Sequence, residues 1–271
     1  MRKNYVIIPG TRMAGLFSYV LQAIQNLSVV NETENKLFIK YTENMLYLDP
    51  RVGGNVWDYY FYQPFEFTKE EIINNPKEQA IFIEDEKVVP LGVTSRPSSE
   101  MIKIGKELTK KFIRVKPHIL EKVDGFIKDT FNGEKYFSIH KRGTDHARDS
   151  GNPLLSLKEY TDQADKFFEE YNFGLLCTDE DSTVKAFKER YGDKIKVYDD
   201  MIRCDNIQGV HYTIGRDNPY KMGEDVMIDA LLMAKSDHLI RTVSNVTIFS
   251  ILYGDCKVTE MDLHLDYSKF S

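Results

Sequence analysis

The chain has 271 residues, of which 42% are hydrophobic, 29% charged and 12% aromatic. This composition is typical of a folded globular protein and excludes a disordered, collagenous or coiled-coil chain. The formal charge is −6, from 36 basic and 42 acidic residues, and the basic residues are scattered. Such a charge distribution lacks the footprint needed to wrap duplex nucleic acid, so we expect no nucleic-acid partner.

The cysteines and the apolar segments indicate the cellular compartment in which we expect the protein. Cys177, Cys204 and Cys256 are odd in number and far apart, which fits neither a disulfide framework nor the spacing of a zinc site. No segment approaches the roughly 18 consecutive apolar residues of a membrane span, and the first apolar run is too short for a signal peptide. We therefore expect a cytoplasmic protein without an integral membrane segment; peripheral contact with a membrane stays open.

The first half of the chain reads as short strands and amphipathic helices. The glycines that follow the first strand are not spaced as G-x-G-x-x-G, so the sequence does not support a dinucleotide-binding fingerprint. Apolar periodicity and capping residues predict strands at 5–8, 36–40 and 79–83 and helices at 16–27, 99–114 and 116–130.

Two features of this half are candidates for contact with an acceptor substrate. Arg12 lies in the loop after the first strand, where it could face a ligand, although a solvated loop arginine explains it equally well. Residues 41–65 contain eight aromatic side chains, among them Trp57. These rings could stack on sugar faces, or they could form a packed satellite cluster; both interpretations stay open.

The second half alternates regularly between strands and helices, which predicts a parallel sheet with helices on both faces. We place the domain boundary in the preceding helical stretch, giving domains 1–125 and 126–271. The expected strands are 136–141, 173–177, 194–198, 238–240 and 257–259, and the expected helices are 156–170, 181–191, 224–234 and 244–253.

Polar residues follow four of these strands. Ligands of open α/β sheets bind beyond the carboxyl ends of the strands, where such residues converge. Arg142 is the first candidate for contact with an anion, and Ser244 begins a helix whose unpaired amide groups suit a phosphate. Together they suggest a diphosphate site without a P-loop or a bound metal. The polar segments are 142–145, 178–181, 199–200 and 242–245.

Several of these residues also have ordinary structural explanations. Ser244 could be only an N-cap, and the acids that follow Thr178 could serve the start of a helix. Asp179 and Asp181 could instead bind a divalent metal, but we favour the capping role. His140 ends an apolar strand, which favours a buried structural histidine over a catalytic base.

Two further features need an explanation. Asp225 and Asp229 lie one turn apart on an apolar helix, so at least one of them needs a partner, which Arg142 or a loop amide could supply. His211 lies in the polar loop 199–222. Because unstructured loops of that length are usually functional, His211 is a candidate for substrate contact.

The segment His140-Lys141-Arg142-Gly143-Thr144-Asp145 resembles the H-x-R-R-x-D motif of the GDP-fucose-dependent fucosyltransferases, which include nodulation-type, core α1,6- and protein O-fucosyltransferases. Segments 176–180 and 236–245 resemble the donor-binding segments of that superfamily, and 10–17 resembles the opening of its N-terminal domain. The resemblance implies an α/β fold of GT-B type, with two Rossmann-like domains facing a cleft. It also implies inverting transfer of L-fucose from GDP-β-L-fucose to a glycan, without a metal or other cofactor.

Carried over by position, the resemblance implies that Arg142 binds the donor diphosphate and stabilises the leaving group. Gly143 stands where the motif has its second arginine, so either one arginine suffices or Lys141 contributes charge. Asp149, Asp145 and His211 are candidates for the base. The predicted donor-binding set is His140, Arg142, Gly143, Thr178, Asp179, Asp225, Ser244 and Asn245, and the predicted acceptor-side set is Arg12, Trp57 and His211.

Two other functions remain open from the sequence. The chain could be a glycosyltransferase that uses another nucleotide sugar, since donor identity rests on the resemblance alone. It could also be a non-catalytic protein that binds a sugar nucleotide or glycan with the same fold. If the chain is a transferase, the expected partners are a GDP-sugar as donor and an oligosaccharide or other glycan as acceptor.

Overall fold

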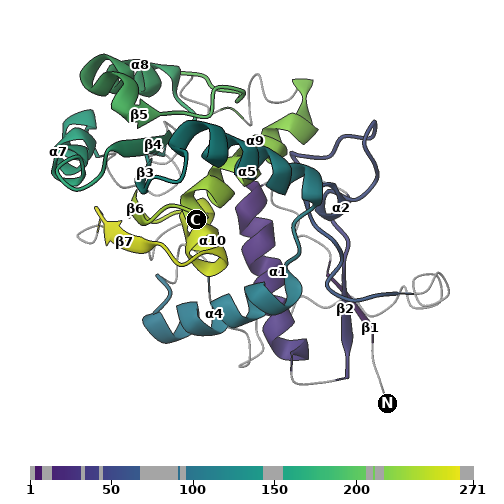
Figure 1. The fold of residues 1–271 in the computed structure, drawn as a ribbon. Coiled ribbons are helices and arrows are strands. Elements are labelled where there is room, and N and C mark those ends of the chain that lie inside the picture. Colours follow the sequence, from purple (N-terminus) through teal and green to yellow (C-terminus); the bar gives the residue numbers. More distant parts are fainter. Residues whose placement is uncertain are drawn as a thin grey trace.

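The computed structural model describes residues 4–7, 14–31, 34–42, 45–67, 91, 96–142, 155–205, 210 and 217–262, with the backbone alone described for 4–7. Within these ranges the chain forms a two-stranded parallel sheet and a five-stranded parallel sheet. Figure 1 shows the two sheets on opposite sides of the molecule with helices between them. No helix in these ranges is both long and apolar enough to cross a membrane.

The smaller sheet and its helices come from the first half of the chain. Ser98 accepts a hydrogen bond from the Met101 amide, 3.3 Å away, and Pro117 occupies the first turn of the next helix, which explains where these two helices begin. The predicted strand at 79–83 lies outside the described residues. The elements are β1 (Asn4–Ile7), α1 (Leu16–Val30), β2 (Lys36–Ile39), α2 (Trp57–Tyr60), α4 (Ser99–Phe112) and α5 (Pro117–Phe131).

The larger sheet confirms the predicted parallel arrangement of the second half. Its strands are β3 (Tyr136–His140), β4 (Phe173–Cys177), β5 (Ile195–Lys196), β6 (His238–Arg241) and β7 (Lys257–Glu260). Their order is β5-β4-β3-β6-β7. The chain order therefore reverses between β3 and β6, and this topological switch point is where open α/β sheets bind ligands.

Within the described residues, four helices connect these strands, and most of their starts and ends follow the sequence signals. Ser156 forms a capping box with Glu159 at the start of the first of these helices. Gly192, with φ of 54°, ends the second helix, 181–191. The predicted start of the helix 224–234 was wrong. Asn218 accepts a hydrogen bond from the Lys221 amide and caps the helix, which therefore begins five residues earlier, at Pro219. The helices are α7 (Leu157–Phe167), α8 (Asp181–Tyr191), α9 (Pro219–Ala234) and α10 (Asn245–Tyr253), with a 3-10 turn at Gly192–Lys194.

One hydrophobic core extends through both halves of the chain. It forms because α10 packs against α1, α4 and α9, while α5 packs against α9 (Figure 1). A second, smaller cluster lies beneath α7 and α8 on the other face of the large sheet. The sheet is therefore covered on both faces, as the apolar strands predict.

The aromatic residues of segment 41–65 belong mainly to this core. Trp57 is 1% exposed, its ring stacks on Phe61 at 4.5 Å, and its indole N–H donates to the Tyr62 carbonyl. Tyr41 meets the Trp57 ring edge-on at 6.0 Å. The packed cluster is the interpretation that the structure bears out, and a sugar-stacking role for Trp57 was wrong because its faces are already covered.

The contact between the ends of α9 and α10 depends on Gly254. A Cβ atom at this position would lie 1.9 Å from the Ala234 carbonyl oxygen, and that backbone atom cannot move aside cheaply. We expect Gly254→Ala to lower the free energy of unfolding by roughly 3 kcal/mol or more. Urea denaturation measures this loss. The control is Gly125→Ala in α5, where nothing lies within 4 Å and stability should rise by about 0.5–1 kcal/mol. Equal effects of the two substitutions would contradict the packing described here.

Candidate functional site

The central strand β3 carries the predicted arginine to the switch point of the sheet. His140, the last residue of β3, pairs in register with Cys177 of β4 and with Arg241 of β6. His140 is 8% exposed, as expected for a structural histidine within the sheet. The Lys141 amide still donates to the Cys177 carbonyl at 3.1 Å, and Arg142, the next residue, is partly exposed. Arg142 therefore lies just beyond the hydrogen bonds that join β3 to β4.

Lys141 is held by a buried ion pair. Its ammonium group binds the Glu180 carboxylate, and the two side chains are 11% and 9% exposed. The Thr183 hydroxyl donates to the same carboxylate at 2.7 Å. The positive charge of Lys141 is thus balanced by Glu180, which bears on the question of whether it replaces the arginine missing at position 143.

The end of β4 is fixed to the loop that follows β5. The Arg203 guanidinium donates to the Thr178 carbonyl at 3.3 Å, and the Cys204 amide donates to the Asp179 carbonyl at 2.9 Å. The Thr178 hydroxyl accepts from the Glu180 amide, also at 3.3 Å. Thr178 and Asp179 therefore lie at the carboxyl edge with their backbone held in place. Among the residues that the structure describes, no group of His, Cys, Asp or Glu is arranged to hold a metal ion.

Ser244 confirms its predicted role as the N-cap of α10. Its hydroxyl accepts from the Thr247 amide at 3.3 Å, and the Thr247 hydroxyl accepts from the Ser244 amide at 3.2 Å. This capping box engages the amides of Ser244 and Thr247, and the dipole of α10 places partial positive charge at this end, which favours an anion. The Asn245 side chain donates to the Ser18 hydroxyl of α1 at 2.7 Å, joining the two halves of the chain beside the site.

Arg241 is a charged residue at the switch point that the sequence reasoning missed. It ends β6, is 5% exposed, donates to the Thr247 hydroxyl at 3.2 Å and forms an ion pair with Glu260 of β7. Its guanidinium thus contacts the first turn of α10 through the Thr247 hydroxyl and helps to hold that turn in place. An arginine at the end of an otherwise apolar strand is the signal that could have found it, because a buried charge needs a partner.

Both aspartates of α9 are buried, and the predicted loop amide is among their partners. The Asp225 carboxylate accepts from the Ile202 amide at 2.8 Å and pairs with Lys221, yet burial keeps its pKa above the ordinary value. Burial also raises the pKa of Asp229 to about 7, against the opposing charge of Arg203. Asp229 is therefore largely protonated below neutral pH.

This pKa predicts a pH dependence of stability. Between the unfolded value, about 4, and about 7, the folded chain holds a proton on Asp229 that the unfolded chain has lost. Stability from this group therefore falls as pH rises through that window, with a slope of roughly 1.4 kcal/mol per pH unit. We expect Asp229→Asn to remove this component, which urea denaturation at several pH values would measure. A pH-independent difference between the two proteins would contradict the assignment.

Several predicted site residues lie outside the described ranges. The structure therefore places neither the candidate bases nor the loop arginine of the first half. These residues are Arg12, Gly143, Asp145, Asp149 and His211.

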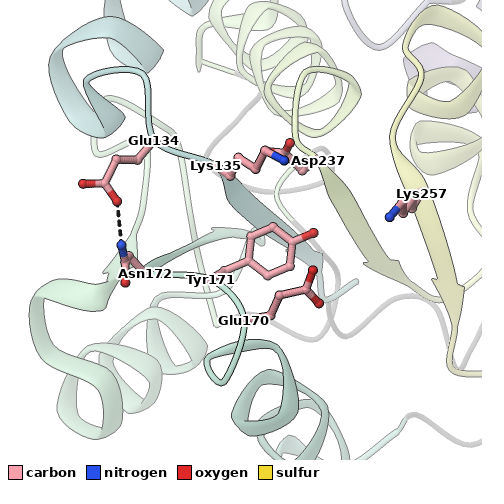
Figure 2. Close-up of a pocket in the computed structure, with 7 residues that line it drawn as sticks. All are labelled: Glu134, Lys135, Glu170, Tyr171, Asn172, Asp237 and Lys257. Carbon is pink, nitrogen blue, oxygen red and sulfur yellow. Dashed lines mark hydrogen bonds between the residues drawn. The ribbon is translucent and has the colours of Figure 1, made fainter.

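A pocket of about 220 Å³ lies at the opposite edge of the large sheet (Figure 2). Its lining includes Asp237, which accepts a hydrogen bond from the first amide of β3 at 3.1 Å, and Asn172, which donates to Glu134 at 2.7 Å. The pocket is thus formed by residues that anchor the amino ends of the strands. It contains none of the predicted site residues, and the switch point at the carboxyl edge remains the better candidate site.

Together the parallel sheet, its switch point and the polar carboxyl edge define the GT-B-like α/β fold of known fucosyltransferases. The structure is similar to that of NodZ alpha-1,6-fucosyltransferase soaked with GDP-fucose, with a TM-score of 0.63 and 16% identity over 98% of this chain and 97% of that one. POFUT1 in complex with GDP gives 0.57 and 10% over 96% and 99%. FUT1 of Arabidopsis thaliana in complex with GDP gives 0.56 and 11% over 94% and 70%.

Neither a family model nor a curated protein matches the chain by sequence. The similarity in structure establishes the predicted fold. Because one fold supports many activities, the reaction has to be argued from the site.

Proposed function

We propose that the chain is an inverting glycosyltransferase that transfers L-fucose from GDP-β-L-fucose to a glycan. The observation that carries this proposal is that Arg142 and the start of α10 follow the carboxyl ends of the neighbouring strands β3 and β6, on either side of the switch point. A guanidinium and a helix N-terminus are suited to the two phosphates of a nucleotide sugar. The similar fold of proteins whose structures contain GDP or GDP-fucose supports the choice of nucleotide.

In this reaction an acceptor hydroxyl oxygen bonds to the anomeric carbon of fucose while the bond from that carbon to the β-phosphate oxygen breaks. The acceptor proton passes to a base, for which Asp145, Asp149 and His211 are the candidates, and GDP leaves with the bonding electrons. Negative charge grows on the departing phosphate. Arg142 and the α10 dipole stabilise that charge, and no metal or other cofactor enters the proposal.

The proposed arrangement assigns the donor to residues 126–271 and the acceptor to residues 1–125. The donor set follows β3, β4 and β6 in the chain and includes Asp225 of α9 and the start of α10. An enzyme of this kind would hold GDP-fucose through the large sheet and receive the glycan from the side of the small one.

Calorimetric titration with GDP and GDP-fucose, combined with an assay of GDP release, tests the proposal. We expect both nucleotides to bind and GDP release to rise when glycan acceptors are added. Tight binding without release on any acceptor would instead indicate a non-catalytic sugar-nucleotide protein. Preference for another GDP-hexose would keep the transferase and change the donor.

A further inference from the structure

A face rich in basic residues lies on α4 and the turn that follows it. Residues 99–116 contain six Lys and Arg against two Glu, whereas the rest of the chain contains 30 basic and 40 acidic residues. The chain is therefore strongly asymmetric in charge although its net charge is negative. A local excess of this kind sets the orientation in which a protein approaches an anionic partner.

The helix directs this charge outward. Its buried residues turn toward the core, whereas Lys103, Lys110 and Lys111 are exposed to solvent together with the two glutamates of the helix. The remaining lysine, Lys106, is bound to Asp255. We call the following exposed or partly exposed residues the basic face: Tyr62, Lys103, Lys110, Lys111, Arg114 and Lys116. The helix alone is about 21 Å long, so the basic face is extended rather than concentrated at one point.

An aromatic ring lies at one end of the basic face. Tyr62 is 42% exposed, and its ring lies beneath the Lys116 ammonium at 4.6 Å and near the Arg114 guanidinium at 5.8 Å. The Tyr62 amide donates to the Arg114 carbonyl at 2.9 Å, which fixes the ring beside the two cations. An amphipathic ring among cations suits the boundary between lipid headgroups and acyl chains.

From this arrangement we propose that the basic face binds the surface of an anionic lipid bilayer. A small anion would need a concave site with converging donors, whereas the basic face extends along α4 and the segment that follows it, and the pocket in Figure 2 includes none of its residues. A duplex would satisfy the lysines but offers no apolar layer for the tyrosine. Each lysine of the basic face should raise the affinity for an anionic bilayer about fivefold. Binding that depends on several such charges is reversible and weakens as salt screens them.

Vesicle co-sedimentation of the full chain tests this inference, and it needs no enzymatic activity. The probes are vesicles of phosphatidylcholine alone and vesicles of phosphatidylcholine and phosphatidylserine in a two-to-one ratio. We expect binding to the second kind only, with release at high salt. Equal binding to both, no binding at low ionic strength, or binding to duplex DNA in place of vesicles would overturn the proposal.

A pair of matched variants assigns the binding to the basic face. Lys103→Gln/Lys110→Gln should lower the partition coefficient about 25-fold, from two fivefold steps. Lys158→Gln/Lys185→Gln removes the same charge from α7 and α8, where the side chains are 80% and 79% exposed, and should change it less than about twofold. An equal loss in both variants would show that net charge, and not this face, determines binding.

Discussion

Arg142→Ala should lower kcat for fucosyl transfer by about two to three orders of magnitude, equivalent to roughly 3–4 kcal/mol of transition-state stabilisation. The loss follows because the adjacent cation, Lys141, is already bound to Glu180 and its charge is balanced there. Arg142→Lys should lose nearly as much, because a lysine lacks the planar pair of donors. Steady-state kinetics with GDP-fucose and an accepted glycan measure both effects.

Thermal unfolding distinguishes a catalytic loss from a folding defect. Arg142 is partly exposed and follows the last paired residue of β3, so its substitution should leave stability within about 0.5 kcal/mol of the parent. The matched control is Arg190→Lys, which alters an exposed arginine paired with Asp165 on the far side of the large sheet and should leave the rate unchanged. An Arg142→Ala variant that keeps its rate would overturn the proposed function.

Glu180→Ala should lower the free energy of unfolding by about 3–5 kcal/mol, because it leaves the buried ammonium of Lys141 without a counter-charge. The double variant Lys141→Met/Glu180→Leu should cost much less, since it removes both charges and keeps the volume. Urea denaturation of the parent and the two variants measures both losses.

An exposed ion pair provides the comparison. Lys158 and Asp162 on α7 are 80% and 49% exposed, so Asp162→Ala should cost less than about 0.5 kcal/mol. A similarly small cost for Glu180→Ala would show that Lys141 is solvated. In the expected case, Glu180 also fixes the residue next to Arg142, and GDP should bind more weakly to Glu180→Ala than to the parent.

Local sequence signals predicted most of the second half because each element has its own start and stop. The apolar runs of β3 and β4, the Ser156 and Ser244 caps and the glycine at 192 identify elements without knowledge of their neighbours. The beginning of α9 was missed, since Asn218 and Pro219 stand within a polar stretch that reads as loop. Alternation of strands and helices then predicted the parallel sheet, whereas the switch point follows from the strand order that the structure shows.

The partners of charged residues could not be predicted in the same way. Lys141 and Glu180 are 39 positions apart, and their pairing depends on the register of β3 against β4. The role of Arg241 depends on β7 and on the first turn of α10 together. Trp57 shows a related limit, because an aromatic cluster that packs inward and one that faces a sugar have the same composition.

The position of β3 in the middle of the sheet also determines when the chain can fold during synthesis. One edge of β3 is covered by β4, but the other pairs with β6, and the contact between Tyr136 and Asp237 joins residues 101 positions apart. A nascent chain that ends before β6 therefore exposes one edge of β3, whose five residues are all buried in the folded protein, and such an edge is prone to pair with other chains. Synthesis must therefore have passed β6 before the sheet beside Arg142 can be completed, and until then the open edge of β3 is a risk for aggregation.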